Sequence, residues 1–513
     1  MSMLQIGVLI NDSIVNDWEN EIIVSLIKEK KINITIIKNH EFRKESRNIK
    51  SIFKNKFVAY LFKIQFKIEK RISENISEVK DYIKNVNIQE NDSNDVFFDL
   101  IINLSYDRSN VLQKSKYGVL ELFYNNAQIN YGNKIGLKEI VHRLPSIELE
   151  LLHYSKSNLK GKLVDKAFYT YHWSAQRNNT NVFKILAPFI IKNINAIKEY
   201  KIKSVIINKD NYLQIGFLCL LKYIVFFYSK IISNLYKKIC FRFLDLKIEY
   251  WTLSFGQKIN FKAELKNITT IDLPKNEFWA DPFLYKKDDE LYVFFEKYVN
   301  KIGRGIISCG KYKEGKVVDV LDILNLGYHL SYPNVFEEDG VTYMIPEISE
   351  KKCLEIYKCT SFPDKWELFS SSFNGEFVVD TVYFKDENGI KWLFLSKSKE
   401  VINDNCSELY IYQIDSLEMI NIIPHKQNPV LVNSEFARNG GGIFMFDKKI
   451  VRPSQDNTFG VYGRKINFNE IIKLDIESYE EKNIKEYSKP FENMKRIHHF
   501  HKLGEDFVFD SYY

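Results

Sequence analysis

The sequence predicts two folds in one chain: an α/β domain with a parallel sheet at the N-terminus, and an all-β, five-bladed β-propeller at the C-terminus. Two observations carry this prediction. Before residue 200, short runs of branched apolar residues alternate with stretches of helical character. After residue 250, aromatic strand segments alternate with charged turns, at a period of about 50–60 residues. The length of 513 residues is enough for about three domains.

The N-terminal sheet is expected to contain three buried strands, at residues 5–10, 32–39 and 97–105. The segments between them have helical character. Strands that alternate with helices are typical of a parallel sheet covered on both faces. We assign residues 1–200 to this α/β domain.

Residues 201–250 are basic and contain apolar stretches that Lys222 and Lys230 interrupt. The longest uninterrupted stretch is about half of the ~20 residues that a membrane-spanning helix needs. A basic amphipathic helix that lies on a membrane or on a neighbouring domain fits this pattern better. We predict an amphipathic helical linker, and a helix pair packed on the first domain is an equally supported alternative.

The net charge of +7 is divided unevenly along the chain. Residues 1–250 carry 39 basic and 25 acidic residues, whereas residues 251–513 carry 34 and 41. Most of the excess lies in residues 151–250, with 17 basic and 5 acidic residues. This pattern favours peripheral contact of the middle segment with an anionic inner membrane, and the mild total argues against a nucleic-acid partner. The first residues lack the basic region of a signal peptide, which predicts a cytoplasmic protein.

Five copies of a strand–turn–strand pattern define the expected propeller at residues 251–513. They start at Trp279, Ser331, Val378, Arg438 and Ile497. The inner strands of such blades surround one axis, so the first residues of the copies should converge there. At this level Asp281 matches Pro333 and Asp380, and the glycine run 440–442 indicates a bulge or a close backbone approach.

Asp281 and Asp380 are the predicted catalytic carboxylates, because paired carboxylates are what glycoside chemistry uses. Turn and capping roles at strand starts are the alternative. Glu347 is the predicted acid, and Glu435 is a further acid candidate. The residues predicted to bind substrate are Trp279, Tyr332, Arg438, Asn439, Asp456 and His498.

No metal and no other cofactor is predicted. His498, His499 and His501 resemble a metal cluster, but His498 and His499 would point to opposite faces of a strand. One histidine on the axis is the better interpretation. Arg438 would offset the negative charge of a phosphate or carboxylate on the substrate.

Short motifs in the C-terminal half resemble a known propeller domain. They are HLSYPNVF, MIPE, FPDKWEL, VVDTVYF, SELYIY, HKQNPV, ARNGG and a QD pair followed by Tyr462-Gly463. In this order they resemble the domain at the N-terminus of plant glucosamine inositolphosphorylceramide transferases, which is also found in bacterial envelope-polysaccharide proteins. That domain is similar to the propellers of furanosidases such as arabinanases. The resemblance implies that Asp281, in Ala280-Asp281-Pro282, is a base and that Asp380 assists it; the furanosidase glutamic acid has no clean counterpart.

The N-terminal half resembles formyltransferase-type domains, through KYGVLELFYNNAQINYGNKIGLKEI and LHYSKSNLKGKLV. Formyltransferases use an Asn, a His and an Asp. Here the stretch that should hold the His reads FYNN at residues 123–126, and the later Asp-Gly-Gly reads LKG at residues 159–161. Without base and orienting acid, formyl transfer lacks a proton carrier. The domain is expected to be degenerate, with Asn125, Asn126 and Asn130 as candidates for polar ligand contacts or as a solvated loop.

These observations lead to a carbohydrate-active protein of bacterial surface polysaccharide biosynthesis, either glycosyltransferase-like or glycan-processing. Its sugar or glycan substrate, nucleotide- or lipid-linked, would bind at the propeller centre. One alternative is a non-catalytic glycan-binding or scaffold protein for a partner transferase. The other is residual formyl or acyl transfer by the N-terminal domain.

Overall fold

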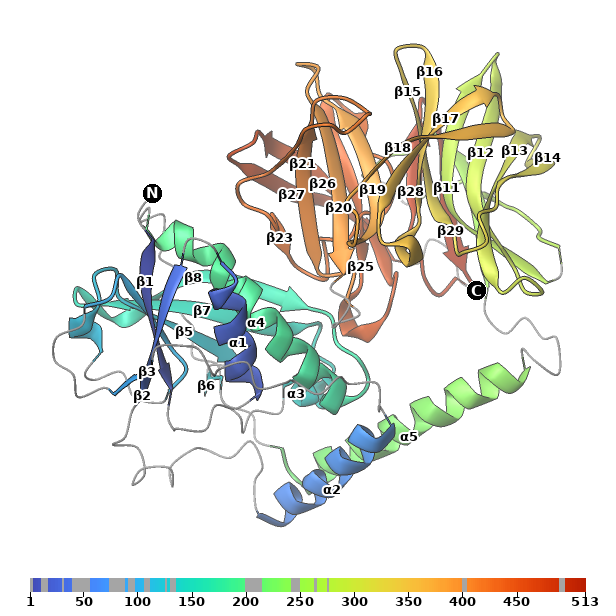
Figure 1. The fold of residues 1–513 in the computed structure, drawn as a ribbon. Coiled ribbons are helices and arrows are strands. Elements are labelled where there is room, and N and C mark those ends of the chain that lie inside the picture. Colours follow the sequence, from blue (N-terminus) through green and yellow to red (C-terminus); the bar gives the residue numbers. More distant parts are fainter. Residues whose placement is uncertain are drawn as a thin grey trace. The chain divides into compact units, whose positions relative to one another are not determined.

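The computed structural model describes most of the chain in two compact units, Met1–Ile232 and Ser233–Tyr513 (Figure 1). The described residues are 3–10, 17–29, 32–38, 56–72, 88–90, 97–105, 111–124, 127–129, 135–198, 215–240, 250–262, 265–274, 276–398, 404–488 and 494–513. The division between the two units falls inside the predicted linker.

The first unit is built on an eight-stranded mixed sheet with the order β3-β2-β1-β4-β5-β7-β8, and β6 pairs with β5. Its strands are β1 (Leu4–Ile10), β2 (Ile32–Lys38), β3 (Ile88–Glu90), β4 (Leu100–Asn103), β5 (Val119–Tyr124), β6 (Ala127–Gln128), β7 (Ile147–Ser155) and β8 (Asn158–Tyr169). The three predicted strands are confirmed as β1, β2 and β4. The expectation of a parallel sheet holds only for β1 to β5. Strand β7 is antiparallel to β5, and β8 is antiparallel to β7. The connection of two residues between β7 and β8 is too short for a crossover to a parallel neighbour.

Five helices accompany this sheet in the described part of the chain: α1 (Asp17–Ile27), α2 (Lys56–Ile72), α3 (Leu137–His142), α4 (Ala175–Lys198) and α5 (Phe217–Ile239). The ring of Trp18 on α1 stacks on Phe183 of α4 at 5.7 Å. Helix α5 occupies much of the predicted linker. Its Tyr223 hydroxyl donates a hydrogen bond of 2.6 Å to Glu69 Oε1 on α2, and its Phe227 ring lies 5.0 Å from Trp173.

The second unit contains five sheets with at least four strands each, which confirms the predicted five-bladed propeller (Figure 1). Blade one is β11 (Glu277–Lys287), β12 (Glu290–Val299), β13 (Arg304–Lys313) and β14 (Lys316–Leu324); blade two is β15 (Ser331–Glu338), β16 (Val341–Glu347), β17 (Leu354–Ser361) and β18 (Lys365–Ser372). Blade three is β19 (Phe377–Lys385), β20 (Lys391–Ser398), β21 (Glu408–Ile414) and β22 (Ile422–Pro424), with β23 (Leu431–Val432) on β21; blade four is β24 (Phe444–Phe446), β25 (Lys449–Asp456), β26 (Lys465–Leu474) and β27 (Tyr479–Tyr487).

Blade five joins the two ends of the propeller sequence. Strands β28 (Phe500–Leu503) and β29 (Asp506–Tyr512) come from the C-terminus, and β9 (Trp251–Gln257) and β10 (Thr269–Thr270) complete the sheet from the other end. Strands β29 and β9 pair along seven residues, and the hydroxyls of Ser254 and Ser511 lie 2.7 Å apart. This closure pairs strand edges that would otherwise stay open.

Blade four departs from the expected repeat, since its first strand starts at Phe444 and not at Arg438. The preceding residues pair with β25 through an isolated bridge: the Gly440 amide donates to the Pro453 carbonyl at 3.0 Å, and the Gln455 amide donates to the Arg438 carbonyl at 2.9 Å. The Phe500 amide donates to the Gly440 carbonyl at 2.7 Å. Gly441 has a φ of 136°, and a Cβ at this position would lie 1.8 Å from the Phe500 carbonyl oxygen. The close backbone approach predicted for the glycine run is confirmed.

Replacement of Gly441 by alanine should destabilise the propeller strongly. Gly375 also has a positive φ, of 85°, but nothing lies within 4 Å of its added Cβ. Both variants carry backbone strain, and only Gly441→Ala adds a clash with main chain. We expect Gly441→Ala to lower the free energy of unfolding by at least ~2 kcal/mol more than Gly375→Ala, measured by urea denaturation. Equal losses for the two variants would contradict this packing.

Candidate functional site

The inner strands of blades one to three share a β-bulge that turns one side chain out of the regular ladder. The register shifts between Ala280 and Phe283, between Ser331 and Asn334, and between Val379 and Val382. At the equivalent positions, Asp281, Tyr332 and Asp380 have left-handed φ values of 49°, 46° and 48°. Bulges of this kind re-aim side chains. The match of Pro333 to the two aspartates is therefore wrong by one residue, and Tyr332 takes that place.

The residues that pair across the first two bulges are both glutamates. Ala280 pairs with Glu296 on β12, and Ser331 pairs with Glu347 on β16. Sequence reasoning selected Glu347 and missed Glu296. The signal was present, because FFE in the first repeat and IPE in the second occupy the same place opposite their bulges.

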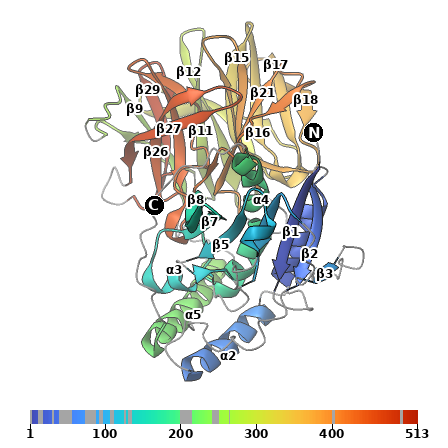
Figure 2. The ribbon, with the colours of Figure 1, turned by 90° about the vertical axis from the view of Figure 1, so that its left-hand side faces the viewer.

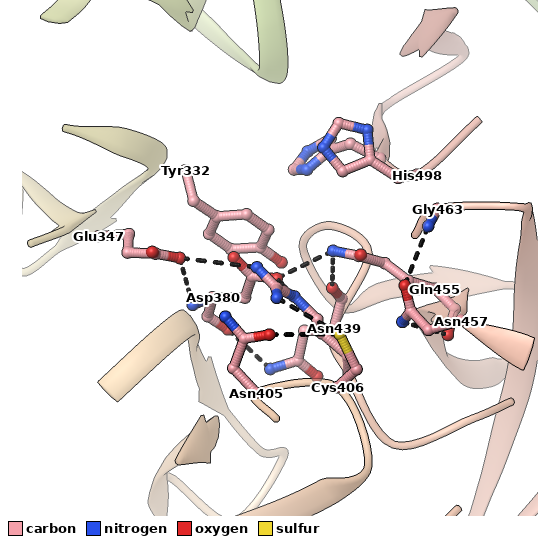
Figure 3. A network of polar contacts seen from close by, with 12 residues as sticks. Tyr332, Glu347, Asp380, Asn405, Cys406, Asn439, Gln455, Asn457, Gly463 and His498 are labelled. Carbon is pink, nitrogen blue, oxygen red and sulfur yellow. Dashed lines mark hydrogen bonds and ion pairs between the residues drawn. The ribbon is translucent and has the colours of Figure 1, made fainter. Parts of the chain in front are cut away.

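The carboxylate of Asp380 is held by residues of blade four (Figure 3). Arg438 Nε donates to Asp380 Oδ2 at 2.5 Å, and Gln455 Nε2 donates to the same oxygen at 2.9 Å. Glu347 approaches from blade two: its Oε2 accepts the Asp380 amide at 3.3 Å and lies 3.8 Å from Arg438 Nη2. Blades two, three and four therefore meet at one buried ion pair.

The pKa values of Glu347 and Glu296 are both raised. Burial raises the pKa of Glu347 well above its usual range, and the charge of Asp380 adds to this, although Arg438 opposes it. Burial likewise raises the pKa of Glu296, with a further contribution from Asp281. Each of these side chains therefore keeps its proton to higher pH than an exposed glutamate, and each lies beside an aspartate, an arrangement suited to proton donation.

Asp281 lies beside His498, which two carboxylates hold. Its Oδ1 is 3.2 Å from His498 Nε2, and His498 Nδ1 is 2.8 Å from Asp510 Oδ2. Burial alone disfavours a charged ring, but Asp510 and Asp281 together outweigh it and raise the pKa of His498 to about 10. At neutral pH the ring is an imidazolium.

Asp510 anchors this arrangement and was missed by sequence reasoning. Its carboxylate accepts the amides of Asp281 at 3.1 Å, His498 at 3.1 Å and His499 at 2.9 Å. The residue lies in β29, between Phe509 and Ser511. Only the closure of blade five, which brings it next to β11, shows why a carboxylate is needed there.

Asp281, His498 and Asp510 also form the group of metal-ligating side chains found among the described residues, with ligand atoms within 4.8 Å of one another. A cation next to Asp281 and His498 Nε2 would have Asp510 as the outer partner of the ring. Without a metal, the cationic ring offsets the charge of only one of the two carboxylates.

Several predicted site residues make their contacts with other protein groups and so brace the site. Asp456 is fully buried and pairs with Arg464 and Lys465; the strand alternation that turns it away directs Gln455 to Asp380. Asn439 donates to the carbonyls of Asp380 and Phe394. Further residues in such roles are Tyr332, whose hydroxyl accepts the Gly441 amide, Trp279, which packs on Phe295, and Glu435, which pairs with Lys465.

Two aromatic rings border the charged group. The Trp251 ring lies 4.1 Å and the Tyr462 ring 5.3 Å from His498. Tyr462 is 40% exposed, and the guanidinium of Arg438 lies 5.1 Å from its ring. An exposed aromatic face next to buried carboxylates is a surface on which a sugar ring can stack. Sequence reasoning quoted Tyr462 only as part of a motif.

The N-terminal candidates receive no comparable support. Asn125, Asn126 and Asn130 lie outside the described residues. In the stretch that would hold a formyltransferase histidine, Tyr124 is buried and donates to Glu139 Oε2 at 2.7 Å. Residues 159–161 lie within β8, in an antiparallel hairpin. A formyltransferase-like fold therefore stays a prediction.

Comparison with known families matches residues 264–502 to the family described as "Glucosamine inositolphosphorylceramide transferase 1, N-terminal". The match spans just under half of the chain and lies within the propeller. It agrees with the resemblance stated from the sequence motifs.

Curated relatives are also similar to the C-terminal region of this chain. Glucosamine inositolphosphorylceramide transferase 1 of Oryza sativa subsp. japonica is 36% identical over 212 residues, and that of Arabidopsis thaliana is 35% identical over 219 residues. These alignments cover 40% and 42% of this chain. The chain spans 28% of the length of each relative.

Solved structures resemble the chain only distantly. A β-xylosidase/α-arabinofuranosidase from a compost microbial metagenome has a TM-score of 0.32 at 14% identity, over 44% of this chain and 82% of that one. An exo-β-1,3-galactanase from Clostridium thermocellum has a TM-score of 0.33 at 12% identity, over 48% and 54%. At these values no function is transferred.

The charge on His498 should make its contribution to stability depend on pH. Its folded pKa of about 10 exceeds the value of ~6.5 for an unfolded histidine. The stabilisation is therefore complete below pH ~6.5 and is lost as the pH rises towards the folded pKa. In urea unfolding experiments, His498→Gln should destabilise the protein more at pH 6 than at pH 9. A pH-independent difference would argue against an imidazolium.

Proposed function

We propose that this protein is carbohydrate-active and binds a sugar at the centre of its propeller. The observation that carries the proposal is the meeting of side chains from all five blades in two charged groups, Glu347–Asp380–Arg438 and Asp281–His498–Asp510. The similarity of residues 264–502 to a family named for a glucosamine transferase supports a carbohydrate substrate. The exposed ring of Tyr462 supplies a stacking surface.

The chemistry we propose is acid–base catalysis at a glycosidic bond. Asp281 accepts the proton of the attacking hydroxyl, and Glu347 gives its proton to the oxygen of the leaving group. Burial and the charge of Asp380 raise the pKa of Glu347, while Arg438 offsets a phosphate or carboxylate on the substrate. Attack by a sugar hydroxyl results in glycosyl transfer, and attack by water results in glycan hydrolysis.

We further propose that the process is bacterial surface polysaccharide biosynthesis on the cytoplasmic side, with a nucleotide- or lipid-linked sugar as substrate. The acidic propeller and the basic residues 151–250 support this setting. The substrate and setting of the plant relatives are not carried over, since the chain spans 28% of their length.

A second candidate is a non-catalytic glycan-binding protein. The observation that favours it is the internal pairing of the two aspartates. Their side chains are only 8% (Asp281) and 2% (Asp380) exposed, and both lie against cationic partners. Such residues can serve structure alone, with sugars bound by the aromatic rim.

Variants of the two proposed catalytic groups distinguish these functions. Asp281→Asn and Glu347→Gln remove a base and an acid at nearly constant shape, and each should reduce glycan product by about a hundredfold or more. The measurement is surface glycan recovered from a deletion strain that expresses each variant, with thermal unfolding to establish the fold. Glu435→Gln is the matched control, because Glu435 pairs with Lys465 and does not join either charged group. Normal glycan from both folded variants would rule out catalysis and favour the binding function.

A further inference from the structure

Helix α5 carries an uncovered apolar stripe along its whole length. Its exposed apolar residues recur every three or four positions: Leu218, Leu221, Val225, Tyr228, Ile232, Leu235 and Ile239. This spacing places them on one side of a helix. Val225 is 62% and Ile232 is 67% exposed, whereas Tyr223 and Phe227, on another side, are buried against the α/β unit.

Helix α2 adds a second stripe with the same character. Phe57, Tyr60, Ile64 and Ile68 recur at spacings of three and four residues, and all are exposed. The two stripes touch where the Phe57 ring stacks on Phe217, at 6.4 Å. Helices α2 and α5 run next to each other in both views (Figures 1 and 2). The apolar surface therefore extends over two helices.

Exposed lysines accompany both stripes: Lys56, Lys63 and Lys67 on α2, and Lys222, Lys230 and Lys237 on α5. The only acidic residue within these two helices is Glu69. It is buried, where its Oε1 accepts Tyr223 and its Oε2 accepts Ser174 at 2.7 Å. The described charged side chains that these two helices expose are therefore all positive, which complements an anionic surface.

The arrangement does not suit a membrane-spanning helix. Phe217–Lys237 is long and apolar enough by composition, with a mean hydropathy of 1.4 and 17% burial. Spanning would, however, place Lys222 and Lys230 in hydrocarbon, at about 2.5–3.5 kcal/mol each near the centre. It would also detach Tyr223 from Glu69 and remove the shortest of the hydrogen bonds that this buried carboxylate accepts. In the plane of the interface, the stripes enter the acyl region and the lysines reach phosphate groups.

We propose that the joint apolar face of α2 and α5 docks on an anionic phospholipid bilayer, with both helices parallel to the membrane plane. The proposal is independent of the chemistry at the propeller centre. It assigns membrane contact to α2, outside the linker in which the sequence placed it. Basic amphipathic helices with aromatic and aliphatic apolar faces bind in this way.

Vesicle flotation of the full chain tests the proposal. The wild type should float with vesicles of 30% phosphatidylglycerol in phosphatidylcholine, an experimental mixture of about physiological charge, and not with phosphatidylcholine alone. Val225→Glu with Ile232→Glu should reduce the bound fraction about tenfold or more, since the variant loses apolar burial and adds repulsion. Lys222→Gln with Lys230→Gln should weaken binding about fivefold per charge. Both pairs are exposed, and unchanged thermal unfolding establishes that the variants fold.

Ile423→Glu is the matched control, because Ile423 is 47% exposed in the propeller and should float like the wild type. Equal flotation of Val225→Glu/Ile232→Glu and wild type would overturn the proposal. So would wild-type protein that resists alkaline carbonate extraction, which indicates a spanning helix. A vesicle-free dimer that Ile232→Glu dissociates, with no flotation of the wild type, would assign the face to a second copy of the chain.

Discussion

The ion pair between Asp380 and Arg438 is the interaction on which the centre of the propeller depends. Asp380 comes from blade three and Arg438 from the segment before blade four, and Glu347 reaches them from blade two. Removal of the guanidinium would leave a carboxylate that is almost inaccessible to water, a state that costs several kcal/mol. The charge therefore fixes how three blades approach one another. The same constraint holds Glu347 next to a negative neighbour, which adds to the effect of burial in raising its pKa.

The centre contains the same arrangement twice, an aspartate with a cation and a buried glutamate close by. In blade one a bulge presents Asp281, a cation (His498) lies beside it, and a glutamate with a raised pKa (Glu296) lies opposite the bulge. Around Asp380 the cation is Arg438 and the glutamate comes from the preceding blade. The difference lies in the cation. Arginine keeps its charge at any physiological pH, whereas a histidine owes its charge to Asp281 and Asp510 and can release a proton if either carboxylate is neutralised.

The propeller was predictable because its repeat is local. Each blade shows an aromatic strand, a charged turn and a second strand within about twenty residues, and the glycines at 440–442 signal their own close contact. The site was predictable only in part. Asp281, Asp380 and Arg438 stand at recognisable repeat positions, but the alignment of Tyr332 depends on a bulge, and bulges leave no mark in a pattern of hydrophobicity. Asp510 owes its role to a strand pairing across about 250 residues of sequence, which periodicity cannot show.

The closure of blade five determines when, during synthesis of the chain, the charged group around Asp281 can form. A chain is made from its N-terminus, so blades one to four can form while the last strands are still missing. His498 and Asp510 belong to the final segment, and Asp510 is also the acceptor for the Asp281 amide in the first blade. Until β29 pairs with β9, Asp281 lacks both its cation and its anchor. The charged group around Asp281 and the closed ring of blades therefore form together, and a partly synthesised propeller has neither.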